Sequence, residues 1–395
     1  MNFEFSNRVQ DLHGSAIREA FKALSKPGMI SFAGGMPAPE MFPNVELAKI
    51  ANDILLNRSN IALQYGITEG YAPLIAQVKS RLNKIGVGNE GDQTIIVTGG
   101  QQGIELITKA LINENDGIAC ENPSFVGALN AFRSYNAKLY GVDMEKDGMN
   151  VDMLDDVLTK NKNIKFVYTI PTFQNPTGIT MSLAKRKQLL EVAKKHNIFI
   201  LEDNPYGELR FYGEDIPTIK SMDTDNRVIY VGSFSKILSP GLRLGFLCAD
   251  ETLIEKVVVC KQVSDVHTNI FAQMLASEYL SEYDIDEQIK KSKELYGAKC
   301  KLMKDCIEKY FPKNVTSTSP QGGIFLWCDM NNGVDSKIIS AKVLERNVAI
   351  VPGAGAMPNS NVVTSAFRLN YSTAADEKIV QGISALGEVL YEYGK

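Results

Sequence analysis

The stretch SFSKILSPGLR, residues 233–243, decides how this chain is interpreted. The apolar, β-branched run VIYVG (228–232) precedes it and predicts a buried strand, and a second apolar run follows at 244–249. One lysine, Lys236, stands between these two runs. Burial lowers the pKa of an ammonium group and frees the amine to act as a nucleophile. An ordinary solvated lysine in a surface turn would look the same, so the rest of the chain must decide.

The residues around this lysine suit a phosphate group. Arg243 and the hydroxyl groups of Ser233 and Ser235 can donate hydrogen bonds to phosphate oxygens. An amine beside a phosphate-binding group matches a phosphorylated cofactor that carries an aldehyde, which is pyridoxal phosphate (PLP). The stretch therefore predicts that PLP is attached at Lys236.

Composition excludes several classes of protein. The 395 residues are 44% hydrophobic and 22% charged, as in soluble globular proteins, and the net charge of −4 argues against nucleic-acid or anionic-membrane partners. No apolar run approaches the ~18 residues that span a bilayer, and the N-terminus lacks a signal-peptide pattern. Six scattered cysteines predict reduced thiols and a cytoplasmic location, and three isolated histidines support no metal site.

The hydrophobic pattern predicts an α/β fold. Helices are expected at residues 15–24 and 44–57. From residue 93 onward strands alternate with helices, and the strands are expected at 93–98, 117–120, 138–142, 164–170 and 198–203. After residue 250 two long helices are expected, at roughly 251–280 and 284–310. The strands at 322–330, 348–353 and 367–372 and the helices at 337–346 and from 374 then predict a second, smaller α+β domain.

Polar residues follow several of these strands. Gly100, Asn175, Asp203 and Lys236 each come at or just after the end of an expected strand. In open parallel α/β sheets, ligands bind beyond the carboxyl ends of the strands. We therefore expect these four residues to share one site.

Each part of PLP finds a candidate residue in the sequence. Asp203 would keep the pyridine nitrogen protonated, and Asn175 and Tyr206 would donate to the phenolic oxygen. The ring would stack on Phe125. The phosphate would be bound by Gly100, Gln101, Ser233, Ser235 and Arg243. Each residue alone has a more ordinary explanation, such as a turn, a cap or a core position, but the whole set is specific for this cofactor.

The same segments resemble the fold-type I PLP-dependent aminotransferases of class I/II, and within them the 2-aminoadipate/kynurenine aminotransferase group. The resemblance runs over nearly the whole chain, and two departures stand out. Phe125 stands where near relatives often carry tyrosine, and Gly100 where they often carry serine. The matching segments are SAIREAFK (15–22), SFAGGMPAPEMFP (31–43), LQYGITEGYAPL (63–74), TGGQQGIEL (98–106), ENPSFVGAL (121–129), IPTFQNPTG (170–178), LEDNPYGEL (201–209), SFSKILSPGLR (233–243), PQGGIFLW (320–327) and FRLNYS (367–372).

The resemblance implies the architecture. We expect a large domain with a mostly parallel seven-stranded sheet and a smaller α+β domain. The N-terminal arm and helix, residues 1–40, would belong to the small domain; residues 41–284 would form the PLP-binding domain and residues 285–395 the rest of the small domain. The Asn122–Pro123 and Asn175–Pro176 bonds are predicted to be cis.

The resemblance also implies the activity. A ping-pong reaction would move the amino group of an L-amino acid (2-aminoadipate, glutamate, or an aromatic or branched-chain amino acid) to a 2-oxo acid such as 2-oxoglutarate, with Lys236 as general base and acid. Arg368 would bind the substrate α-carboxylate, assisted by Asn175 and the backbone of Gly35. Arg18 would bind a distal carboxylate.

The resemblance further implies a homodimer with shared active sites. Tyr65 of each subunit would reach the cofactor phosphate of its partner.

Two other classes of protein remain open at this point. A PLP-dependent lyase or synthase could use the same site, because the protein surroundings steer the reaction of the cofactor. A transcription regulator with an aminotransferase-like sensor domain is the other alternative. Such a regulator needs a winged-helix domain before the GGxP loop, whereas 33 residues precede Gly34. We therefore expect an enzyme.

Overall fold

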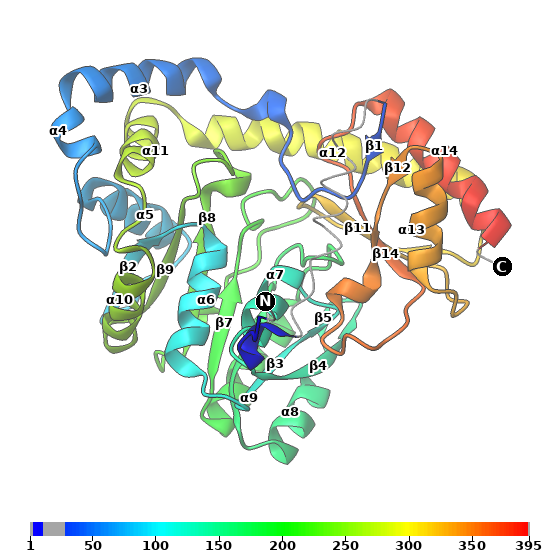
Figure 1. The fold of residues 1–395 in the computed structure, drawn as a ribbon, viewed down its shortest axis with the longest axis horizontal. Helices are drawn as coiled ribbons and strands as arrows, with labels where there is room; N and C mark the ends of the chain where they lie inside the picture. The colour runs from blue at the N-terminus through cyan, green and yellow to red at the C-terminus, as the bar shows by residue number, and fades with distance from the viewer. Residues whose placement is uncertain (1–2, 11–27, 394–395) are drawn as a thin grey trace.

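The computed structural model describes residues 3–10 and 28–393. The predicted helix at 15–24, and Arg18 with it, lie outside the described residues. In the described ranges an α/β part with a large central sheet lies beside a smaller part with an antiparallel sheet (Figure 1).

The central sheet has the strand order β2-β9-β8-β7-β6-β3-β4-β5. The strands from β8 to β4 in this order pair in parallel, whereas β9 and β5 pair antiparallel with their neighbours. The predicted mostly parallel sheet is therefore confirmed, and the two-residue β5 is an eighth strand beyond the seven predicted. The bounds are β2 Asp92–Val97, β3 Gly117–Asn122, β4 Lys138–Glu145, β5 Gly148–Met149, β6 Ile164–Thr169, β7 Phe199–Asp203, β8 Val228–Ser233 and β9 Gly245–Asp250.

Helices cover both faces of this sheet, which is why its central strands are buried on both sides. One cluster of buried apolar side chains packs α8 and α9 onto the sheet, and a larger cluster packs the remaining helices and continues into the smaller part. The helices are α1 Asn7–Gln10, α3 Asn44–Asn57, α4 Ser59–Ala62, α5 Ala72–Lys84, α6 Gly100–Leu111, α7 Val126–Arg133, α8 Val151–Lys160, α9 Leu183–His196, α10 Glu251–Asp265 and α11 Ile270–Glu282.

The smaller part is built around an antiparallel sheet of order β10-β11-β14-β13. Strand β1 (Ile30–Ser31) pairs in parallel with β12 (Val348–Ala349), so the segment after residue 28 lies against the C-terminal third of the chain. Helix α12 runs from the large part across to the smaller one (Figure 1). The remaining bounds are α12 Ile285–Tyr310, β10 Thr316–Ser317, β11 Phe325–Asp329, α13 Ser336–Glu345, β13 Val351–Pro352, β14 Ala366–Asn370 and α14 Asp376–Tyr393. The domain boundaries at 40/41 and 284/285 stay a prediction.

The prediction of one helix over 251–280 is wrong. Helix α10 ends at Asp265 and α11 begins at Ile270, and Val266 between them has a φ of 64°. The Asp265 carboxylate is held by side chains from other elements, and Asn269 caps α11 by accepting a hydrogen bond from the backbone N–H of Ala272 (2.8 Å). Tertiary contacts thus override a locally continuous helical pattern.

Two further features of the chain concern its helices and its proline peptide bonds. None of the helices in the described ranges combines the length and hydropathy needed to cross a bilayer. The two X-Pro bonds predicted to be cis, Asn122–Pro123 and Asn175–Pro176, are both cis.

Candidate active site

Asp203 lies buried at the carboxyl end of β7. Its Oδ2 accepts a hydrogen bond from the hydroxyl group of Tyr168 (2.8 Å), and its Oδ1 has no hydrogen-bond partner among the described residues. Burial raises the pKa of Asp203 to about 7. A buried carboxylate with one open oxygen is ready for a positively charged N–H group, and the protonated nitrogen of a pyridine ring fits that requirement.

Glu121, in β3, is a second buried carboxylate that the sequence interpretation missed. It accepts hydrogen bonds from Thr169 Oγ1 (2.5 Å), from Gln174 Nε2 (3.0 Å) and from the backbone N–H of Ile170. Gln174 also donates to the carbonyl oxygen of Pro123 (2.8 Å). Glu121 therefore ties together the two loops that carry Phe125 and Asn175. Burial raises its pKa to about 7.

Lys236 ends a short 3₁₀ turn, η3 Phe234–Lys236, directly after β8. The turn is capped by Ser233, whose Oγ accepts a hydrogen bond from the backbone N–H of Ser235 (3.1 Å). Lys236 Nζ donates to the carbonyl oxygen of Gly35 (2.5 Å). Burial, together with the nearby guanidinium groups of Arg368 and Arg243, lowers the pKa of Lys236 to about 8. At pH 7 roughly a tenth of this amine is therefore neutral and nucleophilic.

An anion-binding region lies next to this turn, at the N-terminus of α6. A Cβ added at Gly245 would lie 2.7 Å from the backbone nitrogen of Gly100, so the strand backbone closely approaches the first residue of the helix. A Cβ added at Gly99, where φ is 76°, would lie 2.9 Å from Arg243 Cζ, so this guanidinium group lies against the turn. Free helix N–H groups, a guanidinium group and the neighbouring Ser233 make a site for phosphate.

Phe125 and Gln101 meet at Gly127. A Cβ added at Gly127 would lie 2.6 Å from Cε1 of Phe125, and Gln101 Nε2 donates to the carbonyl oxygen of Gly127 (2.9 Å). The side chain of Gln101 is thus used within the protein, and its backbone N–H in the first turn of α6 is the group left for an anion. The partly buried Phe125 ring supplies the flat apolar surface expected for a cofactor ring.

Arg368 comes from β14 of the smaller sheet and reaches the loop that carries Asn175. Its Nη1 donates to Asn175 Oδ1 (2.9 Å) and its Nη2 to the carbonyl oxygen of Ala33 (2.8 Å). The guanidinium group also lies over the ring of Phe325, 4.1 Å from its centroid, and its buried Nε has no partner among the described residues. Burial lowers the pKa of Arg368 to about 10, so it remains a cation at neutral pH. Asn175 Nδ2 in turn donates to the hydroxyl group of Tyr206 (3.4 Å).

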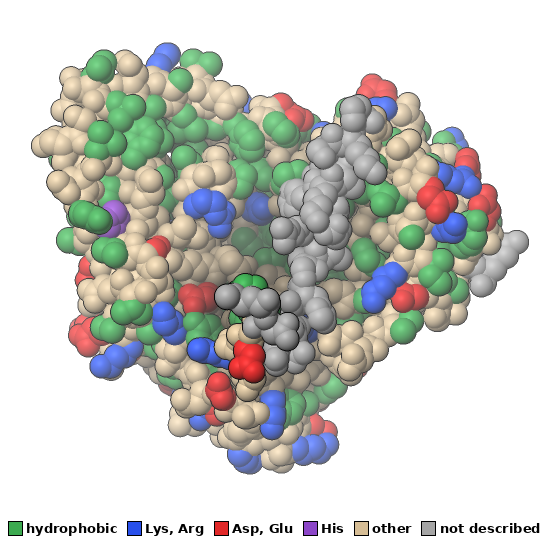
Figure 2. Space-filling view, viewed as in Figure 1, with side chains coloured by type: hydrophobic (Ala, Val, Ile, Leu, Met, Phe, Trp, Pro, Cys, Tyr) green, Lys and Arg blue, Asp and Glu red, His purple; other side chains and the backbone are tan. Residues whose placement is uncertain are grey.

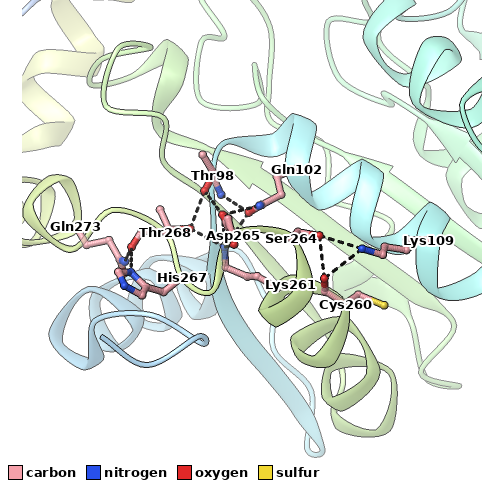
Figure 3. Close-up of polar contacts among 10 residues, drawn as sticks. All are labelled: Thr98, Gln102, Lys109, Cys260, Lys261, Ser264, Asp265, His267, Thr268 and Gln273. Atoms are coloured by element: carbon pink, nitrogen blue, oxygen red, sulfur yellow. Dashed lines mark hydrogen bonds and ion pairs between the residues drawn. The ribbon is translucent and has the colours of Figure 1, made fainter. Parts of the chain in front are cut away.

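A buried polar network that the sequence interpretation also missed fixes the turn before α6 (Figure 3). Lys261 Nζ donates to Asp265 Oδ1 (2.8 Å), Gln102 Oε1 (2.9 Å) and Thr268 Oγ1 (3.0 Å). Asp265 Oδ2 accepts from Thr98 Oγ1 (2.8 Å) and Gln102 Nε2 (2.7 Å). The network joins the turn at Thr98 to the connection between α10 and α11, which orients the N-terminus of α6.

The structure brings most of the predicted site residues together, and one of them lies apart. Tyr65 is 81% exposed and contacts the ring of His267 edge to face, with ring centroids 5.8 Å apart. Gly35 takes part through its carbonyl oxygen, which receives Lys236. Arg18 is outside the described residues.

The sequence and the structure are both similar to those of known aminotransferases. The profile of the family described as aminotransferase class I and II matches residues 29–386. The chain is 38% identical over 393 residues to aromatic-amino-acid aminotransferase 1 of Thermococcus litoralis (98% of this chain and 94% of that protein), and 38% identical over 389 residues to 2-aminoadipate transaminase of Thermus thermophilus (98% and 96%). A kynurenine aminotransferase from Pyrococcus horikoshii, solved with PMP and kynurenine, superimposes with a TM-score of 0.94 at 35% identity, covering 98% of this chain and 97% of that one.

Proposed function

The chain belongs to the class I and II aminotransferases, which makes it a PLP-dependent enzyme acting on amino and oxo acids, and we propose that it transfers the amino group of an L-amino acid to 2-oxoglutarate by a ping-pong reaction. One observation carries this proposal. The carbonyl oxygens of Ala33 and Gly35 receive the guanidinium group of Arg368 and the amine of Lys236, respectively. A carboxylate-binding cation from the smaller part and a partly neutral amine from the large part are therefore held by one short segment, residues 33–35.

The residues divide the chemistry between them. Bound PLP supplies the electron sink that makes the α-proton of the substrate acidic. Arg368 and Asn175 would hold the substrate α-carboxylate, which aims the Cα–H bond at Lys236. Lys236 Nζ would accept that proton and later return one, as general base and then acid. Asp203 Oδ1 would hold a proton on the pyridine nitrogen, and the N-terminus of α6 with Arg243 would hold the phosphate.

The preferred amino donor is the finer part of the proposal. A pocket next to Asn175 and Arg368 has walls from Val126, Trp327 and Val351, and Ser124 contributes a buried Oγ with no partner among the described residues. Apolar walls suit aromatic and branched side chains. The names of the relatives, which include an aromatic-amino-acid aminotransferase and a 2-aminoadipate transaminase, support a broad range that includes both classes.

A panel of amino donors with 2-oxoglutarate as the acceptor tests this proposal. We expect kcat/KM values within about two orders of magnitude for 2-aminoadipate, leucine and phenylalanine, with glutamate and the matching keto acid as products. Initial-rate plots at several acceptor concentrations should be parallel, as a ping-pong reaction requires. Release of ammonia or sulfide without glutamate would instead mean a lyase.

The proposal that Arg18 reads a distal carboxylate has its own test. Arg18→Ala should lower kcat/KM for 2-aminoadipate roughly ten- to a hundredfold, because a charge-assisted pair contributes about 1.5–3 kcal/mol. Leucine has no distal carboxylate, so its kcat/KM should change less than about threefold. An equal loss for both substrates would contradict this role for Arg18.

We further propose that the active unit is a homodimer with shared sites. Exposed apolar side chains gather over α3, α4 and the following loop, at the upper left of Figure 2, where Leu56 is 72% exposed and Leu63 is 72% exposed. Tyr65, which is 81% exposed, lies two residues after Leu63 in this loop. Contiguous exposed apolar surface of this kind is typical of a subunit interface.

Hybrid dimers test the shared site. Chains with Tyr65→Phe keep their own Lys236, and chains with Lys236→Ala keep their own Tyr65. Mixing the two should restore activity above the sum of the separate proteins, because one site of the hybrid contains both native residues. A fully active monomer in analytical ultracentrifugation would contradict the proposal.

Gly100 offers a test of the phosphate site. A Cβ at Gly100 would meet Val231 Cγ1 at 3.5 Å, an ordinary contact, so Gly100→Ser adds a hydroxyl group at the first residue of α6 without a clash. We expect tighter PLP binding by about fivefold, since one hydrogen bond contributes about 1 kcal/mol. Gly99→Ser is the matched control, because its Cβ would overlap Arg243 and its φ is positive. PLP titration of the apoenzyme should show tighter binding for the first variant and weaker binding for the second; weaker binding in both would contradict the assignment.

We also propose a cytoplasmic location. All six cysteines are free, and five of them are buried. Burial raises the pKa of Cys300 to about 12, which keeps this thiol protonated and unreactive. Free thiols of this kind suit a reducing compartment, and cell fractionation with an antibody against the chain would test the location.

A further inference from the structure

A second cavity, of about 670 Å³, lies behind the turn that carries Lys236. Its walls come from α5, from the first turns of α12, and from the loop after β7. Ser233, Phe234 and Ile237 form the wall toward the Lys236 turn. Among the described residues that line the cavity, Ser233 also belongs to the candidate phosphate site, whereas Lys236, Asp203, Asn175 and Arg368 do not line it. The cavity therefore adjoins the candidate active site without including these four residues. Its volume is in the range of small-molecule sites.

The interior of the cavity is mostly apolar and aromatic. The rings of Tyr230 and Phe246 stack with centroids 6.4 Å apart, and Leu82 of α5 and Ile289 of α12 approach from the helices. Phe234 completes this surface next to the turn. Such a surface suits a flat apolar ligand body.

Most of the charged groups in the walls already have partners. Arg81 forms ion pairs with Glu208 and with Asp286 (3.0 Å). Arg210 forms an ion pair with Asp215 (3.1 Å) and donates to Gln321 Oε1 (2.9 Å). Two guanidinium groups thus pair with three carboxylates, so this set carries a net charge of −1.

Two cations in the walls have no such partner among the described residues. Lys84, at the end of α5, and Lys293, on α12, form no hydrogen bond or ion pair with any described residue, so two free cations approach the cavity from separate helices. Asn204 donates from Nδ2 to the hydroxyl group of Tyr230 (2.9 Å), and its Oδ1 is buried against Gly207, so it is not open to a ligand in the cavity. The two lysines are therefore the groups left for an anionic ligand.

We propose that this cavity is a second binding site, and that it takes an aromatic monocarboxylate, such as an indole carboxylate. The ring would lie against Tyr230 and Phe246, and the carboxylate would pair with Lys84 and Lys293. Because Ser233, Phe234 and Ile237 form one wall, the occupant also contacts the turn that carries Lys236. Occupation of the cavity would therefore change the surroundings of Lys236 through this turn.

Calorimetric titration of the PLP-loaded enzyme with indole-3-propionate tests the site. The variant Lys84→Glu/Lys293→Glu should lower the affinity at least tenfold, because both cations become repulsive carboxylates. The matched control Lys79→Glu/Lys291→Glu changes the net charge equally on the same two helices at exposed lysines outside the cavity, and it should change the affinity less than twofold. Equal losses in the two double variants would overturn the proposal.

Two further variants separate this cavity from the substrate site and from unfolding. Arg368→Met removes the carboxylate-binding cation of the candidate active site and should leave indole-3-propionate binding within twofold; loss of binding in this variant would mean that the probe occupies only the substrate site. Ile85→Trp places bulk in the cavity from a side chain that is 48% exposed, so it should fold normally and lower the affinity at least tenfold. Unchanged affinity in Ile85→Trp would contradict the cavity as the site.

The contact with the Lys236 turn has a spectroscopic test. Saturating indole-3-propionate should shift the pH midpoint of the cofactor absorption band by at least 0.3 in wild-type enzyme and not in Lys84→Glu/Lys293→Glu. A band that does not change in the wild-type enzyme with the probe bound would overturn the proposed action on the active site.

Discussion

Lys236→Ala should lower the rate of amino-group transfer roughly 10⁴-fold, the upper range for the loss of a general acid–base group. The same change should leave the fold intact, because within residues 3–10 and 28–393 the amine has no carboxylate partner and forms one hydrogen bond, to the Gly35 carbonyl oxygen. Borohydride treatment of the wild-type holoenzyme should fix the cofactor covalently to the peptide that contains Lys236. Mass spectrometry of a digest locates the modification, and fixation at any other lysine would refute the assignment.

Two other buried lysines differ from Lys236 in their partners. Lys220 Nζ lies 2.8 Å from Asp92 Oδ1, and Lys261 Nζ lies 2.8 Å from Asp265 Oδ1. Both amines are therefore held in ion pairs, and the Asp265 carboxylate opposes the lowering of the Lys261 pKa by burial. The surroundings of Lys236 contain two guanidinium groups instead, and these favour the neutral amine.

The pH dependence of cofactor attachment follows from the lowered pKa. The reactive species is the free amine, whose fraction rises as the pH rises through about 8 and is nearly complete at about pH 9. An unperturbed lysine would still gain free amine up to about pH 10.5. The rate at which the apoenzyme takes up PLP, followed by absorbance, should therefore level off near pH 9. A rate that keeps rising to pH 10.5 would mean that burial does not depress this pKa.

Much of the site could be predicted because its residues stand at strand ends. Asp203 is the last residue of a strand that begins with apolar residues, and Lys236 comes three residues after the end of the next strand, so local pattern and the geometry of parallel sheets were enough to place them at one edge. Arg368 could not be placed in this way, because it comes from the other sheet. Only the resemblance to a known family connected it with the site.

The missed features depend on contacts between distant parts of the chain. Glu121 is 48 residues from Thr169, and Lys261 is 159 residues from Gln102, so no local pattern reveals either hydrogen bond. From the sequence alone, a carboxylate near the end of a strand, such as Glu121, is expected to be exposed to solvent. The cavity behind Lys236 likewise depends on how α5 and α12 pack, which periodicity does not determine.

Asp203→Asn should lower the activity of the enzyme while increasing the stability of the apoenzyme. The amide keeps a similar shape, and its oxygen can still accept the hydrogen bond of Tyr168, but it cannot hold a proton on the pyridine nitrogen through charge. We expect kcat to fall roughly 10²–10³-fold, the usual cost of removing one preorganised electrostatic group. Steady-state kinetics with saturating PLP measures this loss, and retention of more than half of the wild-type kcat would contradict the assigned role.

The same substitution should stabilise the apoenzyme at pH 8. The folded-state pKa of Asp203 is about 7, above the value of 3.8 for an unperturbed aspartate, so the folded protein binds this proton more tightly than the unfolded chain. Below pH 4 the carboxyl group is protonated in both the folded and the unfolded state, so it does not lower the free energy of unfolding. As the pH rises from 4 to 7 the unfolded state loses its proton first, and the free energy of unfolding of the wild-type apoenzyme falls, by an amount on the order of 4 kcal/mol.

Urea unfolding of the two apoenzymes at pH 4.5 and pH 8 measures this difference. Asp203→Asn should be more stable than the wild type at pH 8, and the advantage should shrink at pH 4.5. Saturating PLP should remove or reverse the advantage, because the positively charged pyridine nitrogen would compensate the carboxylate and would leave the amide without its partner. If the Asp203→Asn apoenzyme is less stable than the wild-type apoenzyme at pH 8, the buried carboxylate does not destabilise the folded apoenzyme. The expected pattern would mean that Asp203 is retained at the expense of apoenzyme stability, for the sake of the ring it binds.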